Sequence, residues 1–167
     1  LRSATPGDAG PGGPPRAAAG TNPASLSPSP GQAGDARAKP VTVLVVEDSA
    51  IVRDRLVSMI SEMPRVAIVG QAEEGFKAER MFDQLRPDAV ILDIQLPGIH
   101  GMELLARFKK AHPACVVMVL TTYAFQEFRQ RCMASGADHF FDKATEFERI
   151  TQVLEAMQSR SSIHPPL

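Results

Sequence analysis

The chain of 167 residues is long enough for one domain of ordinary size with a tail. With a formal net charge of −1, nothing marks the chain as a binder of nucleic acids or other polyanions. It contains no apolar run close to the roughly 18 residues needed to cross a bilayer, and its first residues lack the apolar core of a signal peptide, so we expect a cytoplasmic protein without membrane insertion.

The first 40 residues differ in composition from everything that follows. They contain eight Pro, seven Gly and nine Ala, with Leu1 and Leu26 as the only large aliphatic side chains. Such a segment buries too little apolar area to offset the entropy that is lost on ordering. We therefore expect a disordered tail over residues 1–40, a folded domain over 41–160 and a flexible end over 161–167.

Beyond residue 40, short apolar runs alternate with segments in which apolar residues recur at helical spacing. The runs are rich in β-branched residues, which predicts strands buried on both faces, as in a parallel sheet. These predicted strands cover residues 41–46, 66–70, 88–92, 115–120 and 139–141. The segments that follow them predict helices over residues 50–63, 75–85, 101–112, 124–134 and 145–160.

Local signals predict where several of these helices begin or end. Ser49 is a candidate N-cap for the first helix, and Gly136 is a candidate C-terminal stop for the fourth. Thr145, with Glu148 three residues later, has the spacing of a capping box and predicts the start of the fifth helix.

Helical spacing also predicts which side chains face the core. In the second and fourth helices these are Phe76, Met81, Phe82 and Leu85, and Phe125, Phe128 and Cys132. We expect Cys132 and Cys115 to be buried reduced thiols, while a disulfide or a metal pair stays open.

Strict alternation of five strands and five helices over about 120 residues fixes the fold class. Right-handed crossovers then build a parallel sheet that is covered by helices on both faces. A closed eight-stranded barrel would need roughly twice this length. The sequence therefore predicts a doubly wound α/β fold with a five-stranded parallel sheet.

Polar side chains follow four of the five predicted strands, at the point where each strand ends. They are Glu47 with Asp48, Asp93, Thr121 and Lys143. Because the carboxyl ends of parallel strands share one edge of the sheet, we expect these side chains to converge there. Two carboxylates about 4 Å apart repel by roughly 4 kcal/mol at an effective dielectric of about 20. One ammonium group cannot neutralise three carboxylates, and Mg²⁺ suits such an oxygen-rich site.

The order and spacing of these residues resemble those of the receiver domain of two-component response regulators. The resemblance covers residues 41–159 and none of the tail. It rests on Glu47 and Asp48 after the first strand, Asp93 after the third with Pro97, Gly98 and Gly101 beyond it, Thr121 after the fourth, and Phe140 and Lys143 on the fifth.

The resemblance implies a flavodoxin-like strand order, 2-1-3-4-5, and a phosphorylatable switch. Asp93 would accept a phosphoryl group from a phosphohistidine of a sensor kinase or histidine phosphotransfer protein. Mg²⁺ would be bound by Glu47, Asp48, Asp93 and the backbone carbonyl of Gln95. Lys143 and Thr121 would contact the phosphoryl group.

In the same family a buried aromatic residue rotates when the phosphoryl group is added, and here it corresponds to Phe140, acting together with Thr121. The chain would then be a phosphoacceptor that catalyses its own phosphorylation and its slow dephosphorylation, with no separate enzymatic activity. No segment after the fifth helix is long enough for an output domain, so we expect a stand-alone receiver that acts on an unidentified output protein and does not contact nucleic acid directly.

Two other hypotheses stay open at this point. A small hydrolase or phosphatase of the same fold could use Asp93 as its nucleophile, although no Gly-rich phosphate loop follows the first strand. A scaffold receiver that is never phosphorylated is the third hypothesis, and the complete acidic set argues against it. One departure from the family also stands out: Ala144 follows Lys143, where many receivers have Pro.

Overall fold

The computed structural model describes Gly12 and residues 39–161. The chain divides into residues 1–34 and residues 35–167, and every described helix and strand belongs to the second unit. The predicted tail and the predicted flexible end fall almost entirely outside the described residues, so both stay predictions. None of the described helices is long and apolar enough to span a membrane.

Five strands form one parallel sheet in the order β2-β1-β3-β4-β5. The strands are β1 (Val41–Val46), β2 (Val66–Ala72), β3 (Ala89–Leu92), β4 (Val116–Thr121) and β5 (His139–Asp142). This architecture confirms the predicted doubly wound class and the strand order 2-1-3-4-5. The point at which the order reverses lies between β1 and β3, where open α/β sheets bind their ligands.

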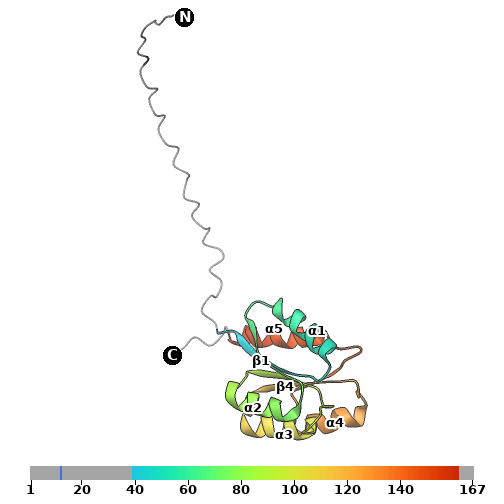
Figure 1. Ribbon diagram of the computed structural model, residues 1–167. Coiled ribbons are helices and arrows are strands. Elements are labelled where there is room, and N and C mark those ends of the chain that lie inside the picture. Colours follow the sequence, from blue (N-terminus) through green and yellow to red (C-terminus); the bar gives the residue numbers. More distant parts are fainter. Residues whose placement is uncertain (1–11, 13–38, 162–167) are drawn as a thin grey trace, which may run out of the picture. The chain divides into compact units, whose positions relative to one another are not determined.

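Helices cover both faces of the sheet. They are α1 (Ala50–Ser61), α2 (Gly75–Leu85), α3 (Gly101–Ala111), α4 (Gln126–Ala134) and α5 (Arg149–Ser161). In Figure 1, α1 and α5 lie on one face, and α2, α3 and α4 lie on the other.

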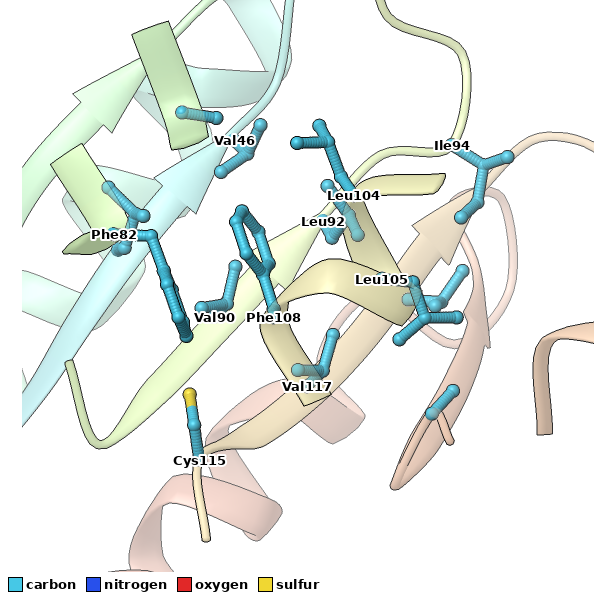
Figure 2. Close-up of a cluster of buried hydrophobic side chains, with 14 of the residues drawn as sticks. Val46, Phe82, Val90, Leu92, Ile94, Leu104, Leu105, Phe108, Cys115 and Val117 are labelled. Carbon is cyan, nitrogen blue, oxygen red and sulfur yellow. The ribbon is translucent and has the colours of Figure 1, made fainter. Parts of the chain in front are cut away.

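Alternation along the strands divides the core into two apolar clusters, one on each face of the sheet. In β1, Val43 and Val45 belong to the cluster beneath α1 and α5, while Leu44 and Val46 belong to the cluster beneath α2, α3 and α4. The second cluster is shown in Figure 2, where the rings of Phe82 and Phe108 stack with centroids 4.1 Å apart. Burial on both faces explains why the central strands β3 and β4 are almost entirely apolar.

The helix boundaries agree with prediction to within two residues, except at α5. Ser49 is the N-cap of α1, because its side chain accepts a hydrogen bond from the backbone N–H of Val52. Gly136 has a φ of +104° just after α4, a conformation that glycine adopts without strain, which confirms it as the helix stop.

The predicted start of α5 at Thr145 is wrong, since the helix begins at Arg149. Residues 143–148 form turns, and the carboxylate of Glu146 accepts a hydrogen bond from the backbone N–H of Asp142. Glu146 therefore holds the end of β5, and the capping-box spacing of Thr145 and Glu148 does not start a helix.

Three side chains that were expected to face the core are exposed instead. Phe76 is 59% exposed, Phe125 is 66% exposed, and Leu85 at the end of α2 is also exposed. In α2 the buried face consists of Gly75, Ala78 and Phe82. Small residues on that face bring the helix close to its neighbours and leave Phe76 on the outside.

The turn between β3 and α3 is packed too tightly to admit a side chain at Gly101. A Cβ atom there would lie 2.6 Å from the backbone oxygen of Ile94, and the Gly101 N–H donates to that same oxygen. Gly98 in this turn has a φ of +87°, which favours glycine. These two glycines fix the path of the chain immediately after Asp93.

Candidate functional site

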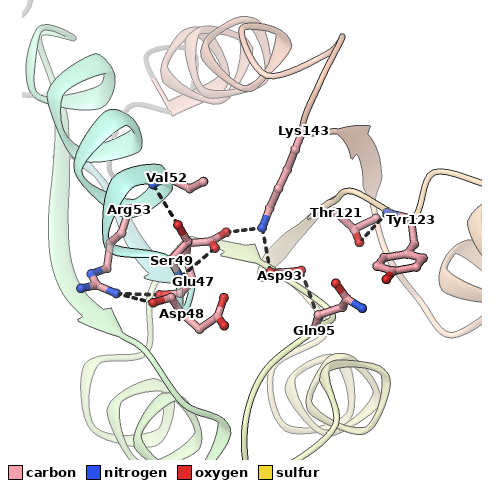
Figure 3. Close-up of polar contacts among 10 residues, drawn as sticks. All are labelled: Glu47, Asp48, Ser49, Val52, Arg53, Asp93, Gln95, Thr121, Tyr123 and Lys143. Atoms are coloured by element: carbon pink, nitrogen blue, oxygen red, sulfur yellow. Dashed lines mark hydrogen bonds and ion pairs between the residues drawn. The ribbon is translucent and has the colours of Figure 1, made fainter.

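Three acidic side chains and one lysine meet at the carboxyl edge of the sheet (Figure 3). Glu47 and Asp48 follow β1, and Asp93 follows the neighbouring strand β3, whose Leu92 is paired with Val46. The turn after β5 supplies Lys143. The structure therefore brings together four of the residues that the strand-end pattern predicted to converge.

Lys143 connects two of the carboxylates. Its Nζ lies 2.7 Å from Asp93 Oδ2 and 2.8 Å from Glu47 Oε2. Both carboxylates are buried, with only 1% of the Glu47 side chain exposed. A buried ion pair is stable only if its geometry is good, and here one ammonium serves two acids.

Burial and charge act against each other in this group. Burial raises the pKa of the Glu47 carboxyl, and the hydrogen bond and charge of Lys143 offset this only in part. For Lys143, burial by itself lowers the pKa, but hydrogen bonds to Asp93 and Glu47 outweigh it and the pKa is raised. Lys143 therefore stays charged, but it offsets the negative charge of Glu47 only in part.

The acidic pair is held in place by contacts from α1. Arg53 Nη1 donates to the backbone oxygen of Glu47 at 2.8 Å, and the Ser49 N–H donates to Glu47 Oε1 at 3.1 Å. The carboxylate of Asp48 is exposed at the mouth of the site. Sequence reasoning missed Arg53, because its spacing on the helix gave no sign of a backbone partner.

These carboxylates satisfy the geometric requirement of a metal site. Glu47, Asp48 and Asp93 each offer an oxygen atom, and the three atoms lie within 4.8 Å of one another. Hard divalent cations such as Mg²⁺ prefer oxygen ligands, and the incomplete neutralisation of Glu47 by Lys143 leaves charge for such a cation to offset. The residues present therefore fit the predicted ion.

The backbone beyond Asp93 is shaped by the same carboxylate. The N–H of Gln95 donates to Asp93 Oδ1 at 3.0 Å, so the two oxygens of Asp93 face different partners, Gln95 and Lys143. This contact holds the N–H of the residue whose carbonyl, in the following peptide, was predicted to be a fourth ligand.

Thr121 ends β4 next to this group, and Phe140 is the second residue of the adjacent strand β5, where it is paired with Val119. Thr121 is buried, and its Oγ1 accepts a hydrogen bond from the N–H of Tyr123 at 3.2 Å. The Phe140 ring is buried, and the guanidinium of Arg129 on α4 lies 4.8 Å from its centroid. The Lys143 N–H donates to the Thr121 carbonyl, which ties the two strand ends together.

Two further polar residues escaped sequence reasoning. His100 lies just before α3, and its Nδ1 accepts from the Met102 N–H and caps that helix. Glu146 binds Arg129 and Arg149 at the turn after β5. The side chains that meet Glu146 come from separate helices, so spacing along the chain could not reveal them.

Residues 43–155 match the family model of the response regulator receiver domain. Among solved structures, the response regulator domain of CheB from Thermotoga maritima has a TM-score of 0.63 and 26% sequence identity, covering 76% of this chain and all of that one. The receiver domain of RcsB from Salmonella enterica serovar Typhimurium has a TM-score of 0.68 at 19% identity, covering 72% of this chain and 90% of that one, and shows the likeness of fold alone.

Curated relatives are longer than the matched region. A protein-glutamate methylesterase/protein-glutamine glutaminase of Saccharophagus degradans is 40% identical over 50% of this chain and 24% of its own length. The response regulator GacA of Pseudomonas aeruginosa is 31% identical over 68% of this chain and 53% of its own length. The chain thus spans about a quarter to a half of these two relatives.

Proposed function

The chain belongs to the response regulator receiver domain family, the phosphorylatable switches of two-component systems, and on this premise we propose that Asp93 is its phosphoacceptor. The observation that carries the proposal is the 2.7 Å contact between Asp93 Oδ2 and Lys143 Nζ, beside the carboxylates of Glu47 and Asp48. This arrangement supplies a nucleophile with charge stabilisation next to it, which is what phosphoryl transfer requires.

In the proposed reaction, a carboxylate oxygen of Asp93 attacks the phosphorus atom of a phosphohistidine. A P–O bond forms as the P–N bond breaks, and the imidazole of the donor leaves with the bonding electron pair. Lys143 donates a hydrogen bond to the phosphoryl oxygens and offsets the charge that they carry. The Gln95 N–H binds Oδ1 of Asp93 and so holds the carboxylate in one orientation.

Mg²⁺ would be held by Glu47, Asp48, Asp93 and the backbone carbonyl of Gln95. When bound, the ion neutralises charge on the oxygens of the transferring group. The exposed carboxylate of Asp48 is open to an ion arriving from solvent, and the buried carboxylate of Glu47 gains the positive charge that Lys143 only partly provides.

Thr121 and Phe140 are the proposed switch. The Thr121 hydroxyl accepts a hydrogen bond from Tyr123, so its own proton stays available for a phosphoryl oxygen. Movement of Thr121 toward that oxygen would open space that the neighbouring Phe140 ring can fill. A local gain of negative charge would in this way change the surface that α4 and β5 present to another protein.

The proposed donor is a sensor histidine kinase or a histidine phosphotransfer protein. Two exposed apolar side chains support a protein partner at this edge of the sheet. Ile51, three residues after Asp48, is 83% exposed in the first turn of α1, and Phe76 is exposed in the first turn of α2. We assign these side chains to contacts with the donor, and we propose that the encounter takes place in the cytoplasm.

The proposal concerns the receiver alone. The methylesterase and glutaminase activities named for some relatives are not carried over, because the matches cover only 24% and 30% of two of those proteins. The output protein therefore has no assignment, and the receiver is proposed to act as a phosphoacceptor with self-catalysed transfer and slow self-dephosphorylation.

Incubation with Mg²⁺ and acetyl phosphate, followed by intact mass measurement, tests the proposal. The expected result is a gain of one phosphoryl group that Asp93→Asn abolishes and that the exposed α1 variant Asp54→Asn retains. A folded protein that gains no phosphoryl group would contradict the proposal and favour a scaffold. Steady hydrolysis of unrelated phosphate esters or other esters would favour an enzyme that uses Asp93 as its nucleophile.

A further inference from the structure

Lys143 lies in the turn between β5 and α5. This turn is not helical, and hydrogen bonds to the side chain and the backbone of Asp142 hold it in place. Asp142 Oδ1 accepts a hydrogen bond from the Ala144 N–H at 2.8 Å, and the Asp142 carbonyl accepts from the Glu146 N–H at 2.8 Å. A proline at position 144 could not donate the first of these bonds. The position of the ammonium at Asp93 therefore depends on how firmly this turn is fixed.

The carboxylate of Glu146 gathers groups from three elements. Its Oε2 accepts from the Asp142 N–H at 3.1 Å and from Arg129 Nη2 on α4 at 2.9 Å. Its Oε1 pairs with Arg149 in the first turn of α5. Only 18% of the Glu146 side chain is exposed. These contacts, with the backbone hydrogen bond from Asp142 foremost, hold the pKa of Glu146 below its usual value.

Arg129, which pairs with Glu146, also contacts Phe140. Its Nη1 donates to the Phe140 carbonyl at 3.2 Å, and its guanidinium lies 4.8 Å from the centroid of the Phe140 ring. One side chain of α4 therefore touches the aromatic ring and the backbone of β5, and also the carboxylate that holds the Lys143 turn. An ordinary surface ion pair lacks these backbone contacts and contributes little.

We infer that Glu146 is a positioning residue for Lys143, and that its pair with Arg129 couples this turn to α4. The inference rests on the proposed function. Glu146 holds the turn so that the ammonium reaches Asp93. When the phosphoryl group attracts Lys143, the turn that carries Lys143 shifts. This shift displaces Glu146 and its partner Arg129, and thereby the Phe140 ring and α4. Phosphorylation then reaches α4 by a connection separate from the Thr121 hydroxyl.

Variants of Glu146 test the positioning role. With Glu146→Ala, the rate of phosphorylation by acetyl phosphate at saturating Mg²⁺ should fall by about tenfold, because a misplaced catalytic group costs rate steeply. The Mg²⁺ affinity should not fall, since Lys143 is not a metal ligand and its displacement frees carboxylate oxygens of Asp93 and Glu47. Glu146→Gln keeps an acceptor oxygen for the Asp142 N–H and should retain most of the rate. Glu148→Ala, in the same turn and exposed, is the matched control.

Variants of Arg129 test the coupling. Arg129→Gln should speed amide hydrogen exchange in residues 126–134 and leave the Mg²⁺ affinity unaltered. The control is Arg131→Gln, an exposed arginine of the same helix, which should leave the exchange as it is in the parent.

The outcomes separate this inference from the proposed function. A parent protein that takes up no phosphoryl group overturns both. A parent that is phosphorylated, with Glu146→Ala reacting at the parental rate, overturns only the positioning role. A merely structural role would lower the rate, the Mg²⁺ affinity and the melting temperature of Glu146→Ala together, which also contradicts the inference. Unchanged exchange in Arg129→Gln overturns the coupling to α4.

Discussion

Lys143 and Asp93 lie 50 residues apart in the sequence, yet Nζ and Oδ2 are 2.7 Å apart at the edge of the sheet. The same ammonium is shared with Glu47. Lys143 therefore has two roles: it partly offsets the charge of a buried pair of acids, and it occupies oxygens that a metal ion would use. These roles predict opposite effects when the lysine is removed.

Lys143→Met should weaken phosphorylation and strengthen metal binding. The phosphorylation rate should fall by roughly 100-fold, since the charge facing the transferring group is lost. The Mg²⁺ affinity should rise by about tenfold, because two buried carboxylates lose their competing cation. Titration with Mg²⁺ and the rate with acetyl phosphate measure the two effects.

The exposed α3 variant Lys110→Met should change neither quantity and serves as the control for Lys143→Met. If Mg²⁺ affinity and phosphorylation rate fell together in Lys143→Met, the shared-ammonium interpretation would be wrong.

Asp48→Asn should remove the stabilisation that Mg²⁺ gives without harming the metal-free fold. Its carboxylate is exposed, so the metal-free melting temperature should stay close to that of the parent. A ligand at 100 times its dissociation constant stabilises a protein by about 2.7 kcal/mol, and this gain should be lost in the variant. Thermal melts with and without Mg²⁺ provide the measurement, with Asp54→Asn as the control. A full Mg²⁺ response in Asp48→Asn would exclude this carboxylate as a ligand.

The sequence was sufficient for the fold and for the acidic group because both depend on strict periodicity. Runs such as residues 41–46 are apolar at every position except Thr42, and a short β-branched run of this kind indicates a strand buried on both faces. Alternation of strands and helices then forces all carboxyl ends to one edge, so Asp93 and Lys143 could be placed near each other without any knowledge of their side-chain contacts.

The predictions that failed concern residues whose contacts come from several helices and strands at once. Helical spacing shows which residues share a face, but in α2 the face that packs consists of Gly75, Ala78 and Phe82, and the large Phe76 is left outside. Glu146 likewise follows no local rule, since Arg129 and Asp142 reach it from other elements. The roles of the site residues, in contrast to their positions, stay predictions for the experiments described.

Gly101→Ala should destabilise the protein far more than Gly70→Ala. A Cβ atom at residue 101 would collide with the backbone of Ile94, which cannot move aside without displacing the turn after Asp93. We expect a loss of about 3 kcal/mol in the free energy of unfolding and a weaker Mg²⁺ response.

Gly70→Ala provides the comparison, because a Cβ atom there would meet the ends of the flexible Met81 and Leu85 side chains. Its cost should stay below about 1 kcal/mol, measured by urea denaturation. Equal losses in the two variants would show that the backbone contact at Ile94 is not decisive.

Cys115 and Cys132 should be inert in the folded protein. Both are fully buried free thiols, and burial raises the pKa of Cys115 to about 12 and also raises the pKa of Cys132. Because the thiolate is the reactive form, iodoacetamide at pH 8 should alkylate neither thiol until the protein is unfolded in urea. The exposed variant Ser58→Cys shows that the reagent is active. Alkylation of native Cys115 as fast as that of the introduced thiol would contradict its burial.

The same shift predicts how stability depends on pH. A group whose pKa is raised by folding contributes its full stabilisation below the pKa that it has in the unfolded chain, and loses it as the pH rises through the folded value. For Cys115 the loss should therefore begin above the ordinary thiol pKa and continue toward about 12, with a slope of up to about 1.4 kcal/mol per pH unit. Cys115→Ala removes packed atoms and therefore lowers stability at neutral pH, but it should flatten this alkaline slope. An equally steep decline in Cys115→Ala and the parent would assign the slope to other groups.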